Sequence, residues 1–250
     1  MSRQVKKYLF LSIQFILYGT YLTLDLLEYK IDLSSYVKFA LVLMCFLYVL
    51  IFTKKDSGKQ QRLLFYGMTF TVVSDIFLLF SDNYFYGVLT FIAVQQLYGI
   101  RITELSNRES CDRTILFSES SKGKKKRLKE LIYRFVTQIL ISVILCILLW
   151  RMGVLVNVLL IASVFYFISL VTNLGRSVKL WIAFPNIKDI KYFAIGIILF
   201  FLCDINVGLF NLSSFINIGS IYGSIYNISS ILMWTYYGPS QVMIALSNEI

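Results

Sequence analysis

The chain contains no histidine, and only two of its 250 residues are proline. The absence of histidine excludes hydrolases built on Ser-His-Asp or Cys-His arrangements, and it excludes zinc sites with histidine ligands. The four cysteines have no spacing typical of a disulfide framework or of a zinc site. Any chemistry must therefore use Asp, Lys, Tyr, Gln, Asn, Ser or water, and we expect no metal and no cofactor.

Charged residues are also scarce, at 15% of the chain against 58% hydrophobic residues, and the mean hydropathy is +0.72. Apolar runs of about twenty residues recur along the chain, and each is long enough to cross a hydrocarbon core of about 30 Å. The sequence therefore predicts an all-α integral membrane protein that forms a single membrane domain over residues 1–250. Eight transmembrane helices are expected, at about 8–28, 34–53, 62–81, 84–103, 131–150, 154–174, 190–210 and 223–246.

Positive charge is concentrated on one side of the predicted membrane. Of the 24 Lys and Arg residues, all but Lys30, Lys38 and Arg151 lie near the N-terminus or near the second, fourth and sixth connections between spans. Because such residues stay in the cytoplasm, we expect both termini and a basic loop, 105–130, on the cytoplasmic side of a cell membrane. The run KGKKKRLKE in this loop is interpreted as a topogenic signal at anionic lipid head groups, because no aromatic residue interrupts it as in nucleic-acid sites.

Two apolar runs, Arg62–Asp82 and Lys191–Asn211, repeat one plan. Each opens with a cation, and an aspartate follows thirteen positions later, Asp75 in the first run and Asp204 in the second. A charged group in a membrane helix costs about 2.5–3.5 kcal/mol on insertion scales, so we expect a functional role for both aspartates. The repetition predicts two related halves of four helices each, in the same orientation. Each run also has a glycine eight positions before the aspartate and a polar residue seven positions after it: Gly67 and Asp82, Gly196 and Asn211.

Four charged residues are expected at one depth in the membrane. Asp75 and Asp204 lie thirteen residues, or about 20 Å, from their cationic flanks, which places both in the outer half of the bilayer. Asp25 reaches the same level or beyond, and Lys38 enters the second span from the outer side. Two alternatives stay open: Asp25 as an interfacial residue and Lys38 as a helix-end residue that snorkels to the surface.

Polar stripes run along four of the predicted spans at helical spacing. Their members are Gln14, Tyr18, Tyr21 and Asp25; Phe91, Gln95 and Tyr98; Tyr166, Ser169, Asn173 and Arg176; and Tyr226, Ser230, Tyr237 and Gln241. Such stripes are expected to face the bundle interior rather than lipid. They serve either as interhelical hydrogen bonds, worth about 0.6 kcal/mol each, or as the lining of a cavity.

Two carboxylates buried in the same site can divide the roles of acid and base between them. In a site of low dielectric constant one of them keeps its proton and the other ionises. The pair can then act as a general acid and as a base or cation stabiliser, as in glycoside hydrolysis.

Three segments resemble the YhhN-like family of eight-span membrane proteins, the lysoplasmalogenases: GMTFTVVSDIFLLFSDNYFYGVLTFIAVQQLY, GIILFFLCDINVGLF and YGPSQVMIALS. The resemblance implies hydrolysis of the vinyl ether bond of lysoplasmalogens to a fatty aldehyde and glycerophospho-ethanolamine or glycerophospho-choline. It implies Asp75 and Asp204 as the catalytic pair. The other motif positions, together with Asp25 from the polar layer, are expected to bind the substrate: Lys38, Gln95, Tyr98, Tyr237 and Gln241.

The chain departs from the family pattern at four positions: Phe39 replaces a usual Pro, Ser74 a Gly, Gln95 a His and Cys203 a Ser. The expected partners are a lysophospholipid and the lipid bilayer, with no nucleic acid and no protein partner. A small-molecule or proton-coupled transporter remains an alternative, and Pro239 would supply the kinked helix that carriers often use. A non-catalytic lipid-binding protein is the other alternative, favoured by Gln95. The composition suggests a bacterial source.

Overall fold

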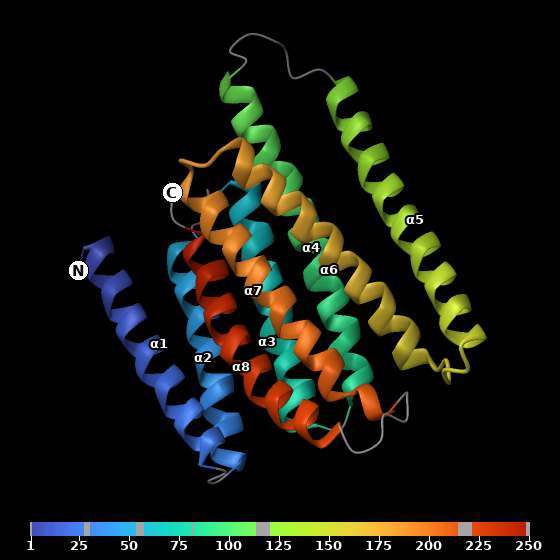
Figure 1. The fold of residues 1–250 in the computed structure, drawn as a ribbon. Coiled ribbons are helices and arrows are strands. Elements are labelled where there is room, and N and C mark those ends of the chain that lie inside the picture. Colours follow the sequence, from blue (N-terminus) through green and yellow to red (C-terminus); the bar gives the residue numbers. More distant parts are fainter. Residues whose placement is uncertain are drawn as a thin grey trace.

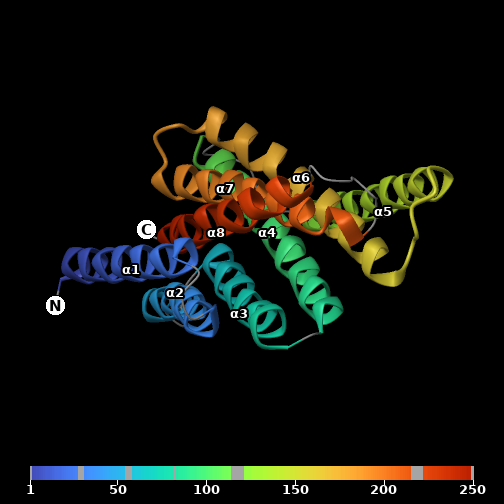
Figure 2. The same cartoon turned by 60° about the horizontal axis from the view of Figure 1, so that its bottom comes forward.

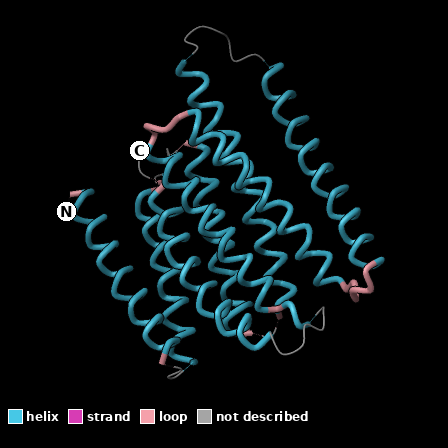
Figure 3. The backbone as a smooth tube through the Cα atoms, in the orientation of Figure 1, coloured by secondary structure: helices cyan, strands magenta, loops and turns pink. Residues whose placement is uncertain are grey.

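The computed structural model describes residues 2–27, 31–53, 58–81, 83–113, 121–214 and 222–248. Within these ranges the backbone consists of long helices joined by short connections (Figure 3). The helices are α1 (Arg3–Leu26), α2 (Ile31–Phe52), α3 (Lys59–Phe80), α4 (Tyr84–Arg113), α5 (Ser121–Arg151), α6 (Val158–Ala183), α7 (Lys188–Phe210), the short 3-10 helix η1 (Leu212–Ser214) and α8 (Tyr222–Leu246).

The predicted all-α membrane architecture is confirmed, and each predicted span corresponds to one long helix. Six helices, α1, α2, α3, α5, α6 and α7, are long and apolar enough to cross a membrane by length and composition. The helices α4 and α8 are comparably long, but they carry more polar residues, among them Gln95, Gln96 and Arg101 in α4. Eight crossings therefore stay a prediction.

The largest differences between the helix boundaries and the predicted spans are at the loop 105–130 and in α6. The expected loop 105–130 is largely helical, because α4 continues to Arg113 and α5 begins at Ser121. Residues 104–113 contain no glycine or proline, so nothing local ends α4 where the apolar run ends. The helix α6 starts later than predicted, where the side chain of the N-cap residue Asn157 accepts a hydrogen bond from the Leu160 N–H at 2.8 Å, and it extends to two residues before Pro185.

Six helices form a closed ring, and two pack on its outside. Contacts run from α2 through α3, α4, α6, α7 and α8 back to α2, whereas α1 lies against α2 and α8, and α5 lies against α6 (Figure 2). The packed pairs α1–α2, α2–α3 and α3–α4 recur as α5–α6, α6–α7 and α7–α8, and α4–α6 corresponds to α8–α2. This is the arrangement that two related four-helix halves would give.

Both chain termini lie at the same end of the bundle (Figure 1). The end of α4 and the beginning of α5 lie at that end too, so the basic residues at the start of α5 are placed there. An even number of crossings requires this arrangement. Which side of the membrane this end faces stays a prediction from the charge distribution.

The two repeated glycines let neighbouring helices approach closely. A Cβ atom on Gly67 in α3 would lie 2.4 Å from Cε1 of Tyr98 in α4. A Cβ atom on Gly196 in α7 would lie 2.6 Å from Cγ1 of Ile244 and 3.2 Å from the Ser240 carbonyl oxygen in α8. The glycine of the repeat thus has the same role in both halves, because close contact needs a residue without a side chain.

Candidate functional site

Asp75 is buried inside the ring and is held by a tyrosine from the opposite half. The carboxylate lies in the second half of α3, and Asp75 is only 2% exposed. The hydroxyl of Tyr237 in α8 donates to its two oxygens, at 2.8 Å to Oδ1 and 2.9 Å to Oδ2. The structure therefore places Asp75 and Tyr237 side by side, although they are 162 residues apart in the chain.

Asp204 has a tyrosine partner of its own. The hydroxyl of Tyr166 in α6 donates a short hydrogen bond to Oδ2 of Asp204 in α7. Asp204 is partly exposed, and its neighbours Ile205 and Val207 on the same helix are exposed apolar residues. This carboxylate therefore lies nearer than Asp75 to the surface that would face lipid.

A chain of packed aromatic rings joins the two carboxylates. The ring of Tyr237 lies edge-on to Phe200 with centroids 5.7 Å apart, and Phe200 lies edge-on to Phe91 at the same separation. Phe91 in turn lies 5.9 Å from Tyr166. Asp75 and Asp204 thus border one apolar, aromatic region, and each of them is hydrogen-bonded to a tyrosine.

Asp25 and Lys38 form a largely buried ion pair beside this region. Nζ of Lys38 lies 2.8 Å from Oδ2 of Asp25, and the Ser34 hydroxyl donates to the same carboxylate. The ammonium also lies 4.6 Å from the ring centroid of Trp234, whose ring is 5.4 Å from that of Tyr237. The expected polar layer is thus continuous from Asp25 to Asp75, but the charge of Lys38 is already compensated.

The remaining predicted substrate residues are buried but lie in different surroundings. Oε1 of Gln95 accepts a hydrogen bond from the Asn173 amide at 3.0 Å, which links α4 to α6. Tyr98 packs on Gly67 in α3, and its hydroxyl lies 3.5 Å from Sδ of Met68, so these contacts fall seven and eight residues before Asp75 on that helix. Gln241 is 0% exposed, and neither atom of its amide is hydrogen-bonded within the described part of the chain.

Most of the polar stripes face the interior, as predicted, with one exception. Tyr226 was expected to face inward, but it is exposed and stacks on Phe210 with centroids 4.4 Å apart. Helical spacing places Tyr166 in a polar stripe but does not identify it as the partner of Asp204, and Trp234 belongs to none of the predicted stripes. The spacing of Trp234, three residues before Tyr237 on one helix, was the available signal.

The helices that carry the site are continuous. α3 and α7 run without interruption through Asp75 and Asp204, and Pro239 lies inside α8 without ending it. Broken helices, which carriers often use to bind substrate, are therefore not found at these aspartates or at Pro239.

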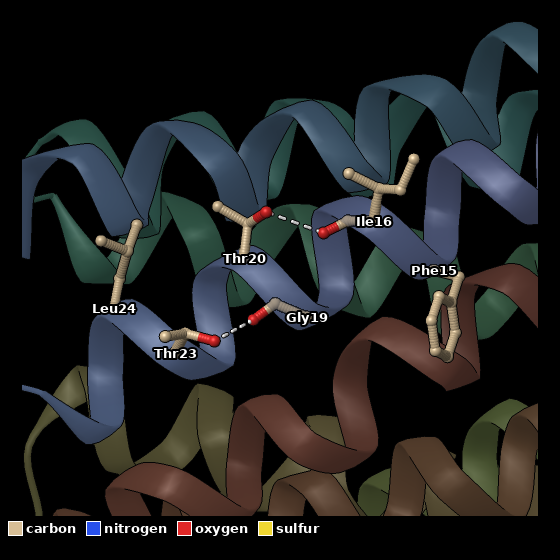
Figure 4. Close-up of a pocket in the computed structure, with 6 residues that line it drawn as sticks. All are labelled: Phe15, Ile16, Gly19, Thr20, Thr23 and Leu24. Atoms are coloured by element: carbon tan, nitrogen blue, oxygen red, sulfur yellow. Dashed lines mark hydrogen bonds between the residues drawn. The ribbon is translucent and has the colours of Figure 1, made fainter.

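A shallow groove lies on the outer face of α1 (Figure 4). It is lined by Phe15, Ile16, Gly19, Thr20, Thr23 and Leu24. Its two hydroxyl groups donate to carbonyl groups of their own helix, Thr20 to Ile16 at 2.8 Å and Thr23 to Gly19 at 2.7 Å. With no titratable side chain in its lining, the groove offers no acid or base, and the site described above is the better candidate for chemistry.

Comparison with protein families identifies a single family over most of the chain. The model of the YhhN family matches residues 33–248, a range that includes every predicted site residue except Asp25. A search of curated proteins and a search of solved structures each found no match. Because the match covers far more than half of the chain, this protein belongs to the YhhN family.

Proposed function

We propose that this chain hydrolyses the vinyl ether bond of lysoplasmalogens and releases a fatty aldehyde and glycerophospho-ethanolamine or glycerophospho-choline. Membership of the YhhN family supports this function, since the sequence resembles the lysoplasmalogenases of that family. The observation that carries the proposal is the geometry of the two carboxylates. Asp75 and Asp204 each accept a hydrogen bond from a tyrosine, and packed aromatic rings connect the two tyrosines.

The proposed reaction needs one acid, one carboxylate and one water molecule. The acid protonates the alkene carbon that is not bonded to oxygen, and the carbon bonded to oxygen becomes an oxocarbenium ion. A carboxylate stabilises this cation and takes a proton from the water that attacks it. The resulting hemiacetal collapses to the aldehyde and the free glycerol hydroxyl, and the proton returns to the acid, so one water is consumed in each turnover.

Burial suggests how the two roles are divided. A neutral carboxylic acid is far less costly to bury than a carboxylate, and Asp75 is the more deeply buried of the two residues. We therefore assign the acid to Asp75, oriented by Tyr237, and the cation-stabilising carboxylate to Asp204, oriented by Tyr166. The partial exposure of Asp204 makes this side the route for an amphiphilic substrate arriving from lipid.

The ion pair of Asp25 and Lys38 suits a zwitterionic head group. A phosphate can exchange with Asp25 as the partner of the Lys38 ammonium, and the head-group amine can then pair with Asp25. The face of Trp234, which now lies beside Lys38, offers a further site for that amine. This arrangement favours ethanolamine or choline head groups over purely anionic ones.

The test is aldehyde release from purified protein in detergent with lysoplasmenyl-ethanolamine as the substrate. Asp75→Asn and Asp204→Asn should each lower the rate at least about a hundredfold while the protein stays folded, because each removes one partner in the proton transfers. Asp32→Asn, at an exposed position of α2, is the matched control and should keep the wild-type rate. Full activity in either site variant would refute the acid–base scheme, and no release from folded wild-type protein would refute the proposed reaction.

A further inference from the structure

A second cluster of polar groups, most of them partly buried, lies between α4, α5 and α6, at the end of the bundle that holds the chain termini. Arg134 of α5 donates from Nη2 to Oε1 of Gln96 in α4 at 3.0 Å. Arg176 of α6 donates to the Gly99 carbonyl oxygen at 3.0 Å and to the Thr103 hydroxyl at 2.6 Å, both in α4. Two guanidinium groups from different helices therefore converge on one stretch of α4.

The positive charge of this cluster is not balanced by a contacting carboxylate. Among the described residues, no acidic side chain forms an ion pair with Arg134 or Arg176. Glu130, one turn before Arg134, attracts both groups from a longer distance, and the two guanidinium groups repel each other. A partly buried charge without a close counter-ion is costly, so a bound anion would stabilise this arrangement.

Several polar atoms of the cluster are buried without a partner. Nε and Nη1 of Arg134 make no hydrogen bond in the described part of the chain. Gly99 makes room for this guanidinium, since a Cβ atom there would lie 2.0 Å from Nη1 and 2.6 Å from Cζ of Arg134. The site is thus built around a guanidinium whose enclosed Nε and Nη1 have no partner, and a phosphate reaches them only if the Arg134 side chain moves outward.

We propose that Arg134 and Arg176 bind the phosphate group of a membrane lipid between α4, α5 and α6. Arg134 lies five residues inside the start of the apolar part of α5 at Lys129, and Arg176 lies seven residues before the end of α6. These separations correspond to about 8 and 10 Å along the helices, a depth from which arginine side chains reach the head-group region. The oxygens of one phosphate can accept hydrogen bonds from both guanidinium groups.

This site is separate from the proposed hydrolytic site. Arg176 lies ten residues from Tyr166 along α6, or about 15 Å, so a lipid whose phosphate binds the two arginines leaves Asp204 free. The site also lies where α5, which packs outside the ring, is joined to α4 through side chains: Gln96 of α4 donates to Gln138 of α5 and accepts from Arg134. A bound phosphate would tie this outer helix to the ring.

The experiment measures lipid bound to the purified full chain by native mass spectrometry, with phosphatidylglycerol, phosphatidylcholine or inorganic phosphate as the probe. Arg134→Gln and Arg176→Gln should each weaken binding of phosphatidylglycerol about tenfold, because each loses a charge-assisted contact. Lys179→Gln, an exposed position on α6 at the same end, is the matched control and should bind as the wild type does. Glu130→Gln should strengthen binding, because it removes the competing negative charge.

Two further variants keep the test decisive if the glutamine variants fail to fold. Arg134→Lys retains the charge but loses the planar fork, and Gly99→Ala displaces the guanidinium without changing any charge, so both should weaken binding. Stronger binding of phosphatidylglycerol than of inorganic phosphate would support a lipid ligand, and equal binding would assign the site to free phosphate instead. Equal losses in Lys179→Gln and in the arginine variants, or no loss in any of them, would overturn the proposal.

Discussion

The Tyr237 hydroxyl on α8 lies 2.8 and 2.9 Å from the two carboxylate oxygens of Asp75 on α3, and these helices belong to different halves of the ring. The ring of Tyr237 also packs on Phe200, which packs on Phe91, so the contact joins the buried carboxyl group to this aromatic region. A polar interaction in the interior therefore connects the two halves of the ring at the proposed site.

Tyr237→Phe should lower the rate of aldehyde release about 10–100-fold while the fold is retained. The substitution removes one hydrogen bond to Asp75, and a hydrogen bond to a charged or reacting group contributes about 1.5–3 kcal/mol. The adjacent Tyr236→Phe is the matched control and should be close to wild type. Equal rates in Tyr237→Phe and wild type would show that Asp75 needs no orientation by this tyrosine.

Tyr166→Phe should lower the rate by a similar factor, because it removes the hydroxyl that donates to Asp204. A suitable comparison is Tyr226→Phe, since Tyr226 is exposed and stacks on Phe210 away from both carboxylates. In the double variant Tyr166→Phe with Asp204→Asn, the tyrosine substitution should cost nothing further. If the rate loss in the double variant equals the product of the two single losses, Tyr166 does not act through Asp204.

Asp25→Asn should destabilise the protein by about 3 kcal/mol, because it leaves the buried Lys38 ammonium without its partner. The double variant Asp25→Asn with Lys38→Met removes both charges and should recover most of the lost stability. Thermal unfolding in detergent measures both effects. If the double variant is no more stable than Asp25→Asn, the ion pair is not the cause of the loss.

Gly196→Ala should destabilise the protein by about 1–3 kcal/mol, because the new Cβ atom would meet backbone atoms of α8, Ile244 N at 3.0 Å and the Ser240 carbonyl oxygen at 3.2 Å. Gly19→Ala is the opposite case. No atom lies within 4 Å of its Cβ position, so the substitution should be neutral or stabilise α1 by about 0.5–1 kcal/mol. A comparison of the two unfolding temperatures checks both expectations. Equal changes would mean that close approach of α7 and α8 does not depend on Gly196.

Much of the fold was predictable from the sequence because the bilayer constrains it. Helices must satisfy their own backbone hydrogen bonds in lipid, so apolar runs of about twenty residues identify them, and the eight predicted ranges match eight helices. The ends of helices were less predictable. The apolar pattern of α4 ends near residue 103, but the polar residues that follow also favour a helix, and α4 continues to Arg113.

The sequence by itself also determined which residues are candidates for the site. The repeated spacing singled out Asp75 and Asp204, and the missing histidine restricted the chemistry available to them. Helical periodicity placed Tyr237, Gln95 and Tyr98 in the interior, where the structure shows them buried. Periodicity states which face of a helix is buried, but it carries no information about which residue on another helix that face meets.

Only the tertiary structure decided the partners. The packing of α8 against α2 and α7 brings Tyr237 to Asp75, while Asp204 is bonded to Tyr166 of the neighbouring α6. The same packing pairs Lys38 with Asp25 and places Tyr98 on Gly67, although the sequence grouped these three side chains together. The physical reason is that a partner across the bundle is set by the rotation and depth of two packed helices, and these depend on contacts such as those at Gly67 and Gly196, far apart in the chain.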